Sequence, residues 1–466
     1  MFDPTTYASR ALTIAAELVP DGERVEQLRT TLRIIKDDLN GTNVHKDEPL
    51  LEDFTGDVQV NDVFLPGELP DTHFTRFVIV DDAKAREADR LPALLVWESN
   101  HDGDPEDYLR KVQAAALDPD KLLRIDRIFG ACVDYPGVAS GDDWVAWMME
   151  RAIRAEAFYA GYRGVPKTRV DAAYRVRMAI RHFIDDNRAA LASQTPLEIH
   201  RAVHAHIRTD PPPSPMRPGD LEPAVTRGAG FTARKYTTYA LLGLAVLLLL
   251  TVFLPFTILW YLLLRHHEKT EKPDSFDRPV HGEPELMANE DRIVQNQLTH
   301  IVDIKPGPFR YFTQRVVLFA IDRLARVVFV HGDLGGITSI HFARWVILHD
   351  KRNDPPRRRH RLLFFSNYDF SWESYLGEFV DRASSGLTAV WSNTEGYPRT
   401  FRLINEGADD EERFKQWARN HQIPTQVWWS GVRYSTVENV NNDVEVHRGA
   451  VRMLEAEEAA GWVTRL

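Results

Sequence analysis

Short strand-like runs and helix-like runs alternate along most of the chain. In the C-terminal part, five runs rich in apolar and β-branched side chains predict five strands, at residues 341–348, 362–367, 386–393, 399–405 and 425–432. Between them, residues 371–383 and 409–421 repeat apolar side chains at helical spacing. After the first strand, this order is βαββαβ. It predicts an α+β fold class with a ferredoxin-like antiparallel sheet that carries helices on one face.

A run of 26 residues without a charged side chain, from Tyr239 to Leu264, interrupts this alternation. As one helix it would be about 39 Å long, which exceeds a hydrocarbon core of about 30 Å. The aromatic rings of Tyr239 and Trp260 are of the kind that favours the headgroup layer, and Pro255 can bend the run. We therefore predict a membrane segment here; the alternative is a helix buried in a soluble core.

The sequence before this run resembles the sequence after it. THFTRFVIVDD (72–82) is similar to IHFARWVILHD (340–350), and LLVWESNHDGDPEDYL (94–109) to LLFFSNYDFSWESYL (362–376). Three further pairs follow in the same order: 141–144 with 408–411, 157–164 with 427–434, and 170–184 with 440–454. The matches predict two tandem ferredoxin-like repeats that form an intrachain pseudo-dimeric barrel, with the membrane segment inserted between them.

These patterns predict six successive regions. They are an N-terminal helical segment (1–59), a first repeat (60–208), a Pro-rich linker (209–237), the hydrophobic membrane segment (238–265), a linker with an amphipathic helix (266–334) and a second repeat (335–466).

Composition and charge narrow the possible partners and the compartment. The net charge is −11, and no long block of Lys or Arg occurs, so a nucleic-acid partner is not expected. Cys132 is the only cysteine, which excludes an intramolecular disulfide and a four-cysteine metal site and is typical of a reducing compartment. We expect a membrane protein with its folded domains on the cytoplasmic side.

One set of chemically capable side chains occurs in both repeats. The candidates for catalysis are two arginines and two aspartates, and the candidates for cofactor binding are two histidines: Arg76, Asp102, Arg344, Asp369, His73 and His341. Because side chains alternate along a strand, His341 and Arg344 can face the same cavity only if a bulge intervenes. Each arginine can equally form a structural ion pair, for which the nearby aspartate is the candidate partner.

The paired segments HFTRFVIV and HFARWVIL, each with an SN-x-D segment after it, resemble the dimeric α+β-barrel superfamily, which includes dye-decolourising haem peroxidases. The resemblance covers residues 60–190 and 335–455. It implies the barrel fold and raises the possibility of a haem held by His341 or His73. The GxxDG motif that supplies the distal aspartate of these peroxidases is missing, so the resemblance does not extend to their catalytic motif.

The barrel and the membrane segment constrain each other. A single crossing at 239–264 would separate the repeats, so either the run turns back at Pro255 in a monotopic arrangement, which we favour, or each repeat pairs with another chain.

Residues 314–330 form an amphipathic segment, which either lies in the headgroup plane or packs on the protein core. Its basic residues are Arg315, Arg323 and Arg326.

Two functions follow from these observations. The first is a peroxidase-like oxidoreductase whose barrel encloses a small apolar ligand and a haem cofactor. The second is a non-enzymatic binding or scaffold protein on the membrane surface. In both, the lipid bilayer is the expected partner, and the oligomeric state is left open.

Overall fold

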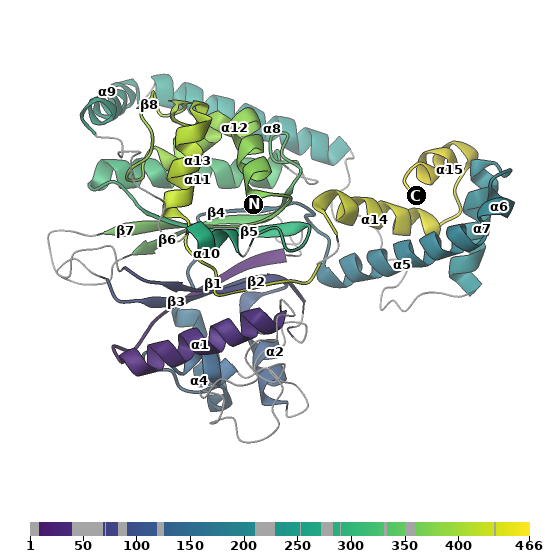
Figure 1. Cartoon of the computed structure of the whole chain (residues 1–466). Helices are drawn as coiled ribbons and strands as arrows, with labels where there is room; N and C mark the ends of the chain where they lie inside the picture. Colours follow the sequence, from purple (N-terminus) through teal and green to yellow (C-terminus); the bar gives the residue numbers. More distant parts are fainter. Residues whose placement is uncertain are drawn as a thin grey trace.

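The chain forms a mixed α+β fold built around two antiparallel sheets (Figure 1). The computed structural model describes residues 9–39, 69, 71–82, 91–118, 125–209, 229–251, 253–271, 283–288, 290–329, 333–349, 359–432 and 435–466. Most of the predicted Pro-rich linker, at 210–228, lies outside these residues.

The first sheet has the strand order β1-β3-β2-β10, and all neighbouring strands are antiparallel. The elements of the N-terminal half are β1 (Ser9–Glu17), α1 (Gly22–Leu39), β2 (Thr72–Val80), β3 (Leu94–Asp102), α2 (Pro105–Leu117), α3 (Ile125–Phe129), α4 (Asp142–Glu150), β4 (Ala157–Ala160), α5 (Lys167–Asp186), α6 (Arg188–Leu191) and α7 (Pro196–Thr209).

The second sheet has the order β4-β6-β7-β5. The C-terminal half contains α8 (Ala229–Thr251), α9 (Leu254–Thr270), α10 (Glu283–Met287), β5 (Gln295–Asp303), α11 (Pro308–Val327), β6 (Ile340–His349), β7 (His360–Asp369), α12 (Trp372–Trp391), β8 (Thr400–Phe401), β9 (Asn405–Glu406), α13 (Glu411–His421), β10 (Val427–Ser430), α14 (Val437–Ala450) and α15 (Ala456–Val463).

The two halves exchange one strand each. The first half supplies β4 to the second sheet, where it pairs with β6, and the second half supplies β10 to the first sheet, where it pairs with β2. The similar sequence blocks lie on the same elements in both halves: β2 with β6, β4 with β10, and α5 with α14. Neither half can therefore complete its sheet without the other.

The predicted order βαββαβ occurs in both halves, but on other elements than predicted. Leaving aside the shorter helices and the hairpin of β8 and β9, the halves are β1-α1-β2-β3-α2-β4 and β5-α11-β6-β7-α12-β10. The predicted strand at 386–393 is wrong, because these residues continue α12, and the predicted strand at 399–405 is reduced to the small hairpin of β8 and β9. A short apolar run such as 386–393 fits a buried helix as well as a strand.

The missing strands come from two segments predicted otherwise. Ser9–Glu17 was predicted to be helical and is β1, which pairs along its whole length with β3. Gln295–Asp303 was placed in a linker and is β5, which pairs along its whole length with β7. Neither segment has a marked strand composition, so pairing with a buried neighbour determines its conformation.

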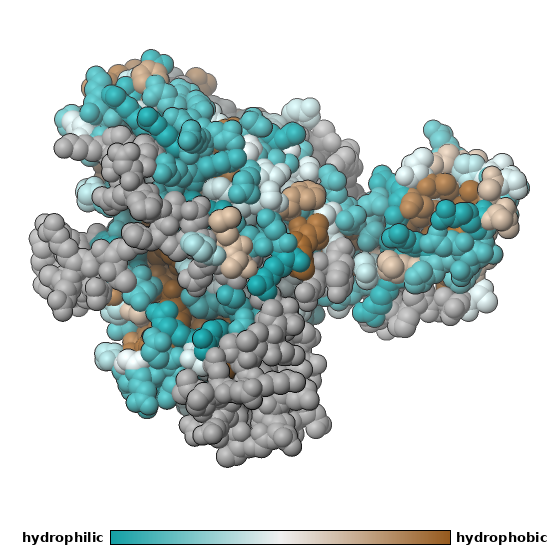
Figure 2. Space-filling model, viewed as in Figure 1, coloured by the Kyte–Doolittle hydropathy of each residue, from teal (hydrophilic) through white to brown (hydrophobic). Residues whose placement is uncertain are grey.

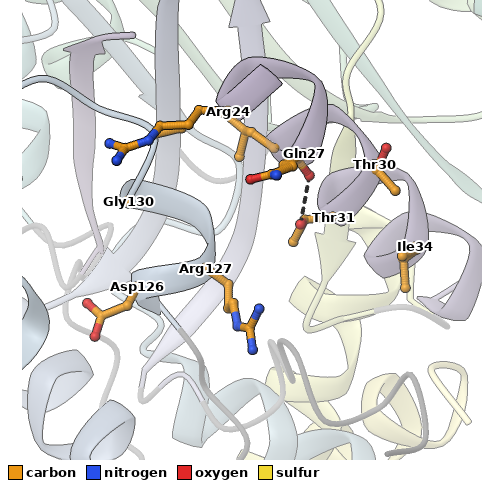
Figure 3. A pocket seen from close by; sticks show the side chains of 10 residues that line it. Arg24, Gln27, Thr30, Thr31, Ile34, Asp126, Arg127 and Gly130 are labelled. Carbon is orange, nitrogen blue, oxygen red and sulfur yellow. Dashed lines mark hydrogen bonds between the residues drawn. The ribbon is translucent and has the colours of Figure 1, made fainter. Parts of the chain in front are cut away.

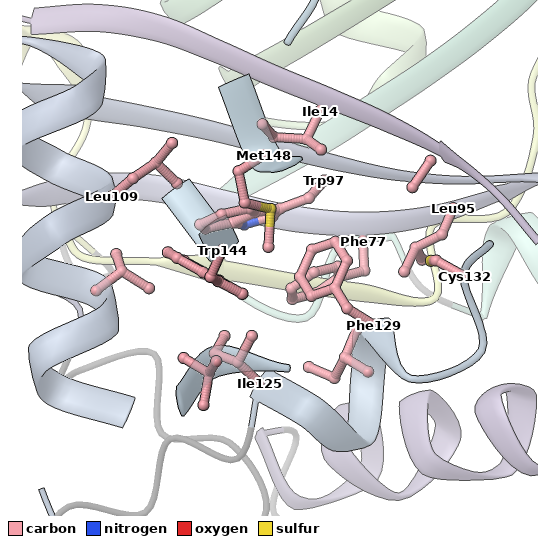
Figure 4. Packing of buried hydrophobic residues seen from close by; sticks show 14 of the residues in the cluster. Ile14, Phe77, Leu95, Trp97, Leu109, Ile125, Phe129, Cys132, Trp144 and Met148 are labelled. Atoms are coloured by element: carbon pink, nitrogen blue, oxygen red, sulfur yellow. The ribbon is translucent and has the colours of Figure 1, made fainter. Parts of the chain in front are cut away.

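The two sheets lie face to face, with helices on their outer faces (Figure 1). Phe77 and Trp97 point to the outer face of the first sheet, where they stack and contact Phe129 (Figure 4). Side chains of both sheets share the space between the sheets, for example Val78 with Val346. Every residue of β2 is buried, since helices cover one face of this sheet and the other sheet covers the second.

Candidate functional site

A bulge brings the predicted histidines into the space between the sheets. The register of β2 with β3 shifts between Thr72 and Phe74, and the register of β6 with β7 shifts at the equivalent place. His73 is therefore the extra residue of its strand and lies on the same side as Arg76. His73 and His341 are completely buried, and each contacts a phenylalanine of the opposite sheet.

Each histidine is held by the aspartate that ends the neighbouring strand. His73 Nε2 lies 2.9 Å from Asp102 Oδ1, and His341 Nε2 lies 2.8 Å from Asp369 Oδ1. The second oxygen of each carboxylate accepts a hydrogen bond from the first backbone N–H of a helix, that of Lys167 in α5 (2.5 Å) or Val437 in α14 (2.8 Å). Both aspartates thus fasten a helix N-terminus to a bulged strand.

The electrostatics of this arrangement favour an ionised Asp102. Burial alone would raise its pKa, but the charge and hydrogen bond of His73, together with the Lys167 N–H, lower the pKa below its usual value. The carboxylate can therefore hold the imidazole and the helix N-terminus at the same time.

The predicted arginines also point between the sheets, but the aspartates are not their partners. Arg76 Nε donates to Glu98 Oε2 at 2.8 Å, and Arg344 lies 2.8 Å from Glu98 Oε1. Asn100 donates to the same carboxylate at 2.7 Å. The structure thus contains buried ion pairs of the kind considered above, but one glutamate serves both arginines.

Both arginines also reach the strands of the opposite sheet. The terminal nitrogens of Arg76 donate to the carbonyl oxygens of Leu298 and Ser366 and to Asn367 Oδ1. In the equivalent position, Arg344 donates to the carbonyl oxygens of Leu12 and Ser99 and to Asn100 Oδ1. The guanidinium N–H groups of both arginines thus donate to other groups of the protein, and these hydrogen bonds connect the two sheets.

Sequence reasoning missed Glu98 and Tyr162. Glu98 is an acidic residue within an apolar strand, which was a usable signal, and Phe365 occupies its place in the second half. Tyr162 follows β4 and lies between the two histidines, with its ring centroid 5.6 Å from each imidazole. Burial raises the pKa of Tyr162 well above its usual value, so its hydroxyl stays protonated.

The residues around the histidines do not fit a haem. An axial imidazole must present a nitrogen to an open cavity wide enough for the macrocycle. Here Nε2 of each histidine contacts an aspartate, and the rings of Phe74, Phe342 and Tyr162 pack against the imidazoles at centroid distances of 5.1–5.6 Å. The described part of the chain also contains no group of three or more His, Cys, Asp or Glu side chains arranged to hold a metal ion.

A groove of about 260 Å³ lies elsewhere, between α1 and α3 (Figure 3). Arg24, Gln27 and Thr31 of α1 face Asp126 and Arg127 of α3 across it. The Asp126 carboxylate is engaged by the Tyr135 hydroxyl and the Val138 N–H. This groove is on the outer face of the first sheet, away from the histidines and arginines.

The predicted membrane segment is divided between two helices. α8 ends at Thr251, α9 begins at Leu254, and Pro255 lies in the first turn of α9, where its missing N–H is tolerated. Among the described residues, no helix combines the length and the apolar composition that crossing a bilayer requires. The break between the two helices lies next to Pro255.

Aromatic and aliphatic side chains of these helices divide between protein and solvent. Tyr239 on α8 is exposed, whereas Leu264 on α9 is buried and Trp260 Nε1 donates to Thr313 Oγ1 of α11 at 3.2 Å. At the end of α9, Arg310 donates to both oxygens of Glu271, which fastens the helix to the second half.

The segment predicted to be amphipathic is α11. Its predicted apolar face, which includes Leu318, packs on the core of the second half, so the core-packing alternative holds for that face. The basic residues have protein partners: Arg315 pairs with Glu156 (3.1 Å), and Arg326 pairs with Asp322 (2.7 Å). The guanidinium group of the third, Arg323, lies 4.9 Å from the ring centroid of an exposed phenylalanine.

Large apolar side chains are exposed together on α8, α9 and α11, and we call this surface the apolar face. Seventeen of the 23 large hydrophobic side chains that are exposed in the described part belong to it. They are Tyr236, Tyr239, Leu241, Leu244, Leu247, Leu248, Phe253, Leu254, Phe256, Ile258, Leu259, Tyr261, Leu262, Leu263, Phe312, Val316 and Phe319. Apolar side chains are visible along the upper edge in Figure 2, where Figure 1 places α8 and α9.

Comparison with protein-family models, curated proteins and solved structures finds no match to this chain.

Proposed function

We propose that this protein is a non-enzymatic binding or scaffold protein that attaches to the surface of a lipid bilayer through the apolar face. The observation that carries the proposal is the concentration of exposed apolar side chains on three neighbouring helices. Soluble monomers rarely expose apolar patches of this extent without a partner. A bilayer is the occupant that suits a surface made of an uncharged 26-residue run with aromatic residues near its ends.

The finer fold belongs to the same proposal. The two halves are ferredoxin-like repeats related by duplication, and together they form a pseudo-dimeric barrel of the α+β type. The exchange of β4 and β10, the equivalent bulges and the equivalent histidine–aspartate pairs support this assignment. The barrel interior is filled by side chains that hold the sheets together, which favours a scaffold over the peroxidase-like alternative.

Strand exchange also supports monotopic attachment. Because each half completes the other's sheet, both halves must lie on one side of the bilayer, and the apolar segment must return to that side. The α8 limb from Tyr239 to Thr251 is about 20 Å long, and the α9 limb from Leu254 to Leu264 is about 16 Å. Each limb alone is shorter than a hydrocarbon core of about 30 Å.

Attachment should depend on apolar insertion more than on headgroup charge. Three of the four basic side chains of α11, those of Arg310, Arg315 and Arg326, pair with acidic side chains. We therefore expect similar binding to vesicles of neutral phosphatidylcholine and to vesicles that contain acidic lipid, with little effect of salt.

Vesicle flotation of the purified full chain tests the proposal. An Asp at the centre of a membrane helix costs about 3 kcal/mol on an insertion scale, so Leu247→Asp combined with Phe256→Asp should reduce binding at least tenfold. Met453→Asp is the matched control, since Met453 is 62% exposed but lies between α14 and α15. Wild-type protein that does not float, or a double variant that binds like the control, would refute attachment through the apolar face.

A further inference from the structure

Two histidines face each other where β6 ends and β7 begins. His349 and His360 are directly paired in the antiparallel register of these strands. Their Nδ1 atoms are 3.2 Å apart, their ring centroids are 5.1 Å apart, and the rings are nearly perpendicular, at 82°. Neither histidine belongs to the barrel interior or to the apolar face.

The separation of the two nitrogens matches that of two imidazoles bound to one metal ion. With metal–nitrogen bonds of 2.0–2.1 Å and tetrahedral angles, the two ligand nitrogens are about 3.3 Å apart. Square-planar coordination brings adjacent ligands to about 2.9 Å. The observed 3.2 Å lies between these values, and in the metal-free pair it is the length of a hydrogen bond between the two rings. The strand register places the two histidines directly opposite each other.

Aromatic and charged side chains surround the two rings. The ring of Tyr311 on α11 packs 4.5 Å from His360 and 6.0 Å from His349. Burial and the charge of Arg315 lower the pKa of His349, while Glu156 opposes them more weakly.

The pair supplies two ligand nitrogens. Among the residues that the structure describes, no third His, Cys, Asp or Glu completes a metal-binding group with these two. We propose that His349 and His360 bind one borderline divalent transition-metal ion through their Nδ1 atoms. Imidazole ligands suit Cu²⁺, Ni²⁺ and Zn²⁺, and Cu²⁺ should bind most tightly.

Titration of the full chain with Cu²⁺ in detergent solution tests this site. We expect one equivalent to bind at least tenfold more tightly than to the His349→Ala or the His360→Ala variant. Pulsed electron paramagnetic resonance detects the remote nitrogen of each coordinated imidazole, and it should report two imidazoles per Cu²⁺ in the wild type and one in either variant.

The control is His182→Ala, which removes an exposed histidine from α5 and should change neither result. Circular dichroism checks that each variant is folded, as expected for substitutions at the last residue pair of β6 and β7. The proposal is overturned if the tight site survives both substitutions, or if only one imidazole coordinates in the wild type. Because these readouts need no membrane, they are independent of the proposed attachment.

Discussion

Removing the charge of Glu98 should destabilise the packing of the two sheets against each other. This carboxylate is 1% exposed and is the partner of two completely or almost completely buried cations, Arg76 and Arg344. Burial lowers the pKa of Arg344 to about 10, so Arg344 stays charged at neutral pH. Burial also lowers the pKa of Arg76, and the charge of Glu98 opposes that effect. Taking one partner out of a buried ion pair typically costs 3–5 kcal/mol, because the remaining charge is left without compensation. We expect a loss in this range for Glu98→Gln.

Calorimetry in detergent measures this loss as a shift in Tm. If all 466 residues unfold together, an unfolding entropy of about 2.1 cal/mol/K per residue gives about 1 kcal/mol/K, so the expected shift is about 3–5 °C. The control is Glu106→Gln, which removes an exposed i,i+4 pair with Arg110 and should leave the Tm almost unchanged. A Glu98→Gln variant that melts within 1 °C of this control would refute the assigned role.

A double-mutant cycle checks that the loss arises from the arginines. Arg344→Met in the Glu98→Gln background removes one of the two buried charges that have lost their partner. The loss of stability in the double variant should therefore be smaller, by at least 1 kcal/mol, than the sum of the losses in the two single variants. Strictly additive effects would mean that Glu98 acts through other contacts, such as its hydrogen bond with Asn100.

Three further predictions concern titration, reactivity and cofactor binding. Burial raises the pKa of Asp443 to about 6, against a smaller opposing effect of Arg177. Asp443 therefore binds a proton more tightly in the native protein than in the unfolded chain. Its contribution to stability falls as the pH rises from about 4 to 6. Asp443→Asn should stabilise the fold by about 1–2 kcal/mol at pH 7.5 and flatten the melting-temperature profile over that interval; an unchanged profile would contradict this. Burial also raises the pKa of Cys132 to about 12, so a thiol reagent at pH 8 should label the unfolded chain at least 100-fold faster than the native one, and equal rates would refute the burial. Added haemin should give no saturable absorption band that depends on His73 or His341, and a band lost on substitution of either would show that the interior opens for haem.

Local sequence patterns were sufficient to predict the elements that have a clear apolar pattern and a similar segment in the other half. The blocks at 72–82 and 340–350 are indeed equivalent strands, and those at 170–184 and 440–454 are equivalent helices. The strands β1 and β5 could not be found in this way, because SRALTIAAE and QNQLTHIVD have no clear period and become strands only by pairing with β3 and β7. Tertiary pairing outweighs local propensity at such positions.

The candidate site shows the same limit. The recurrence of His73 and Arg76 in the second half identified side chains that do lie together, but the direction of each depends on a bulge that period-two reasoning cannot supply. The pairing of Arg76 with Glu98 needed the register of β2 with β3, in which the two residues are directly opposite. A charged residue in an otherwise apolar strand was the one signal of that pairing in the sequence.

Comparison of the two halves gives an internal control for the proposed attachment. The helices α1 and α11 occupy the same place in the order of elements, each between the first and second strands of its half. None of the large hydrophobic side chains that are exposed in the described part lies on α1, whereas α11 exposes Phe312, Val316 and Phe319 at helical spacing. For folding alone, each helix needs only one apolar face, which covers its sheet. The additional apolar surface therefore reflects a requirement of the second half only, which is the half whose α11 lies against α8 and α9.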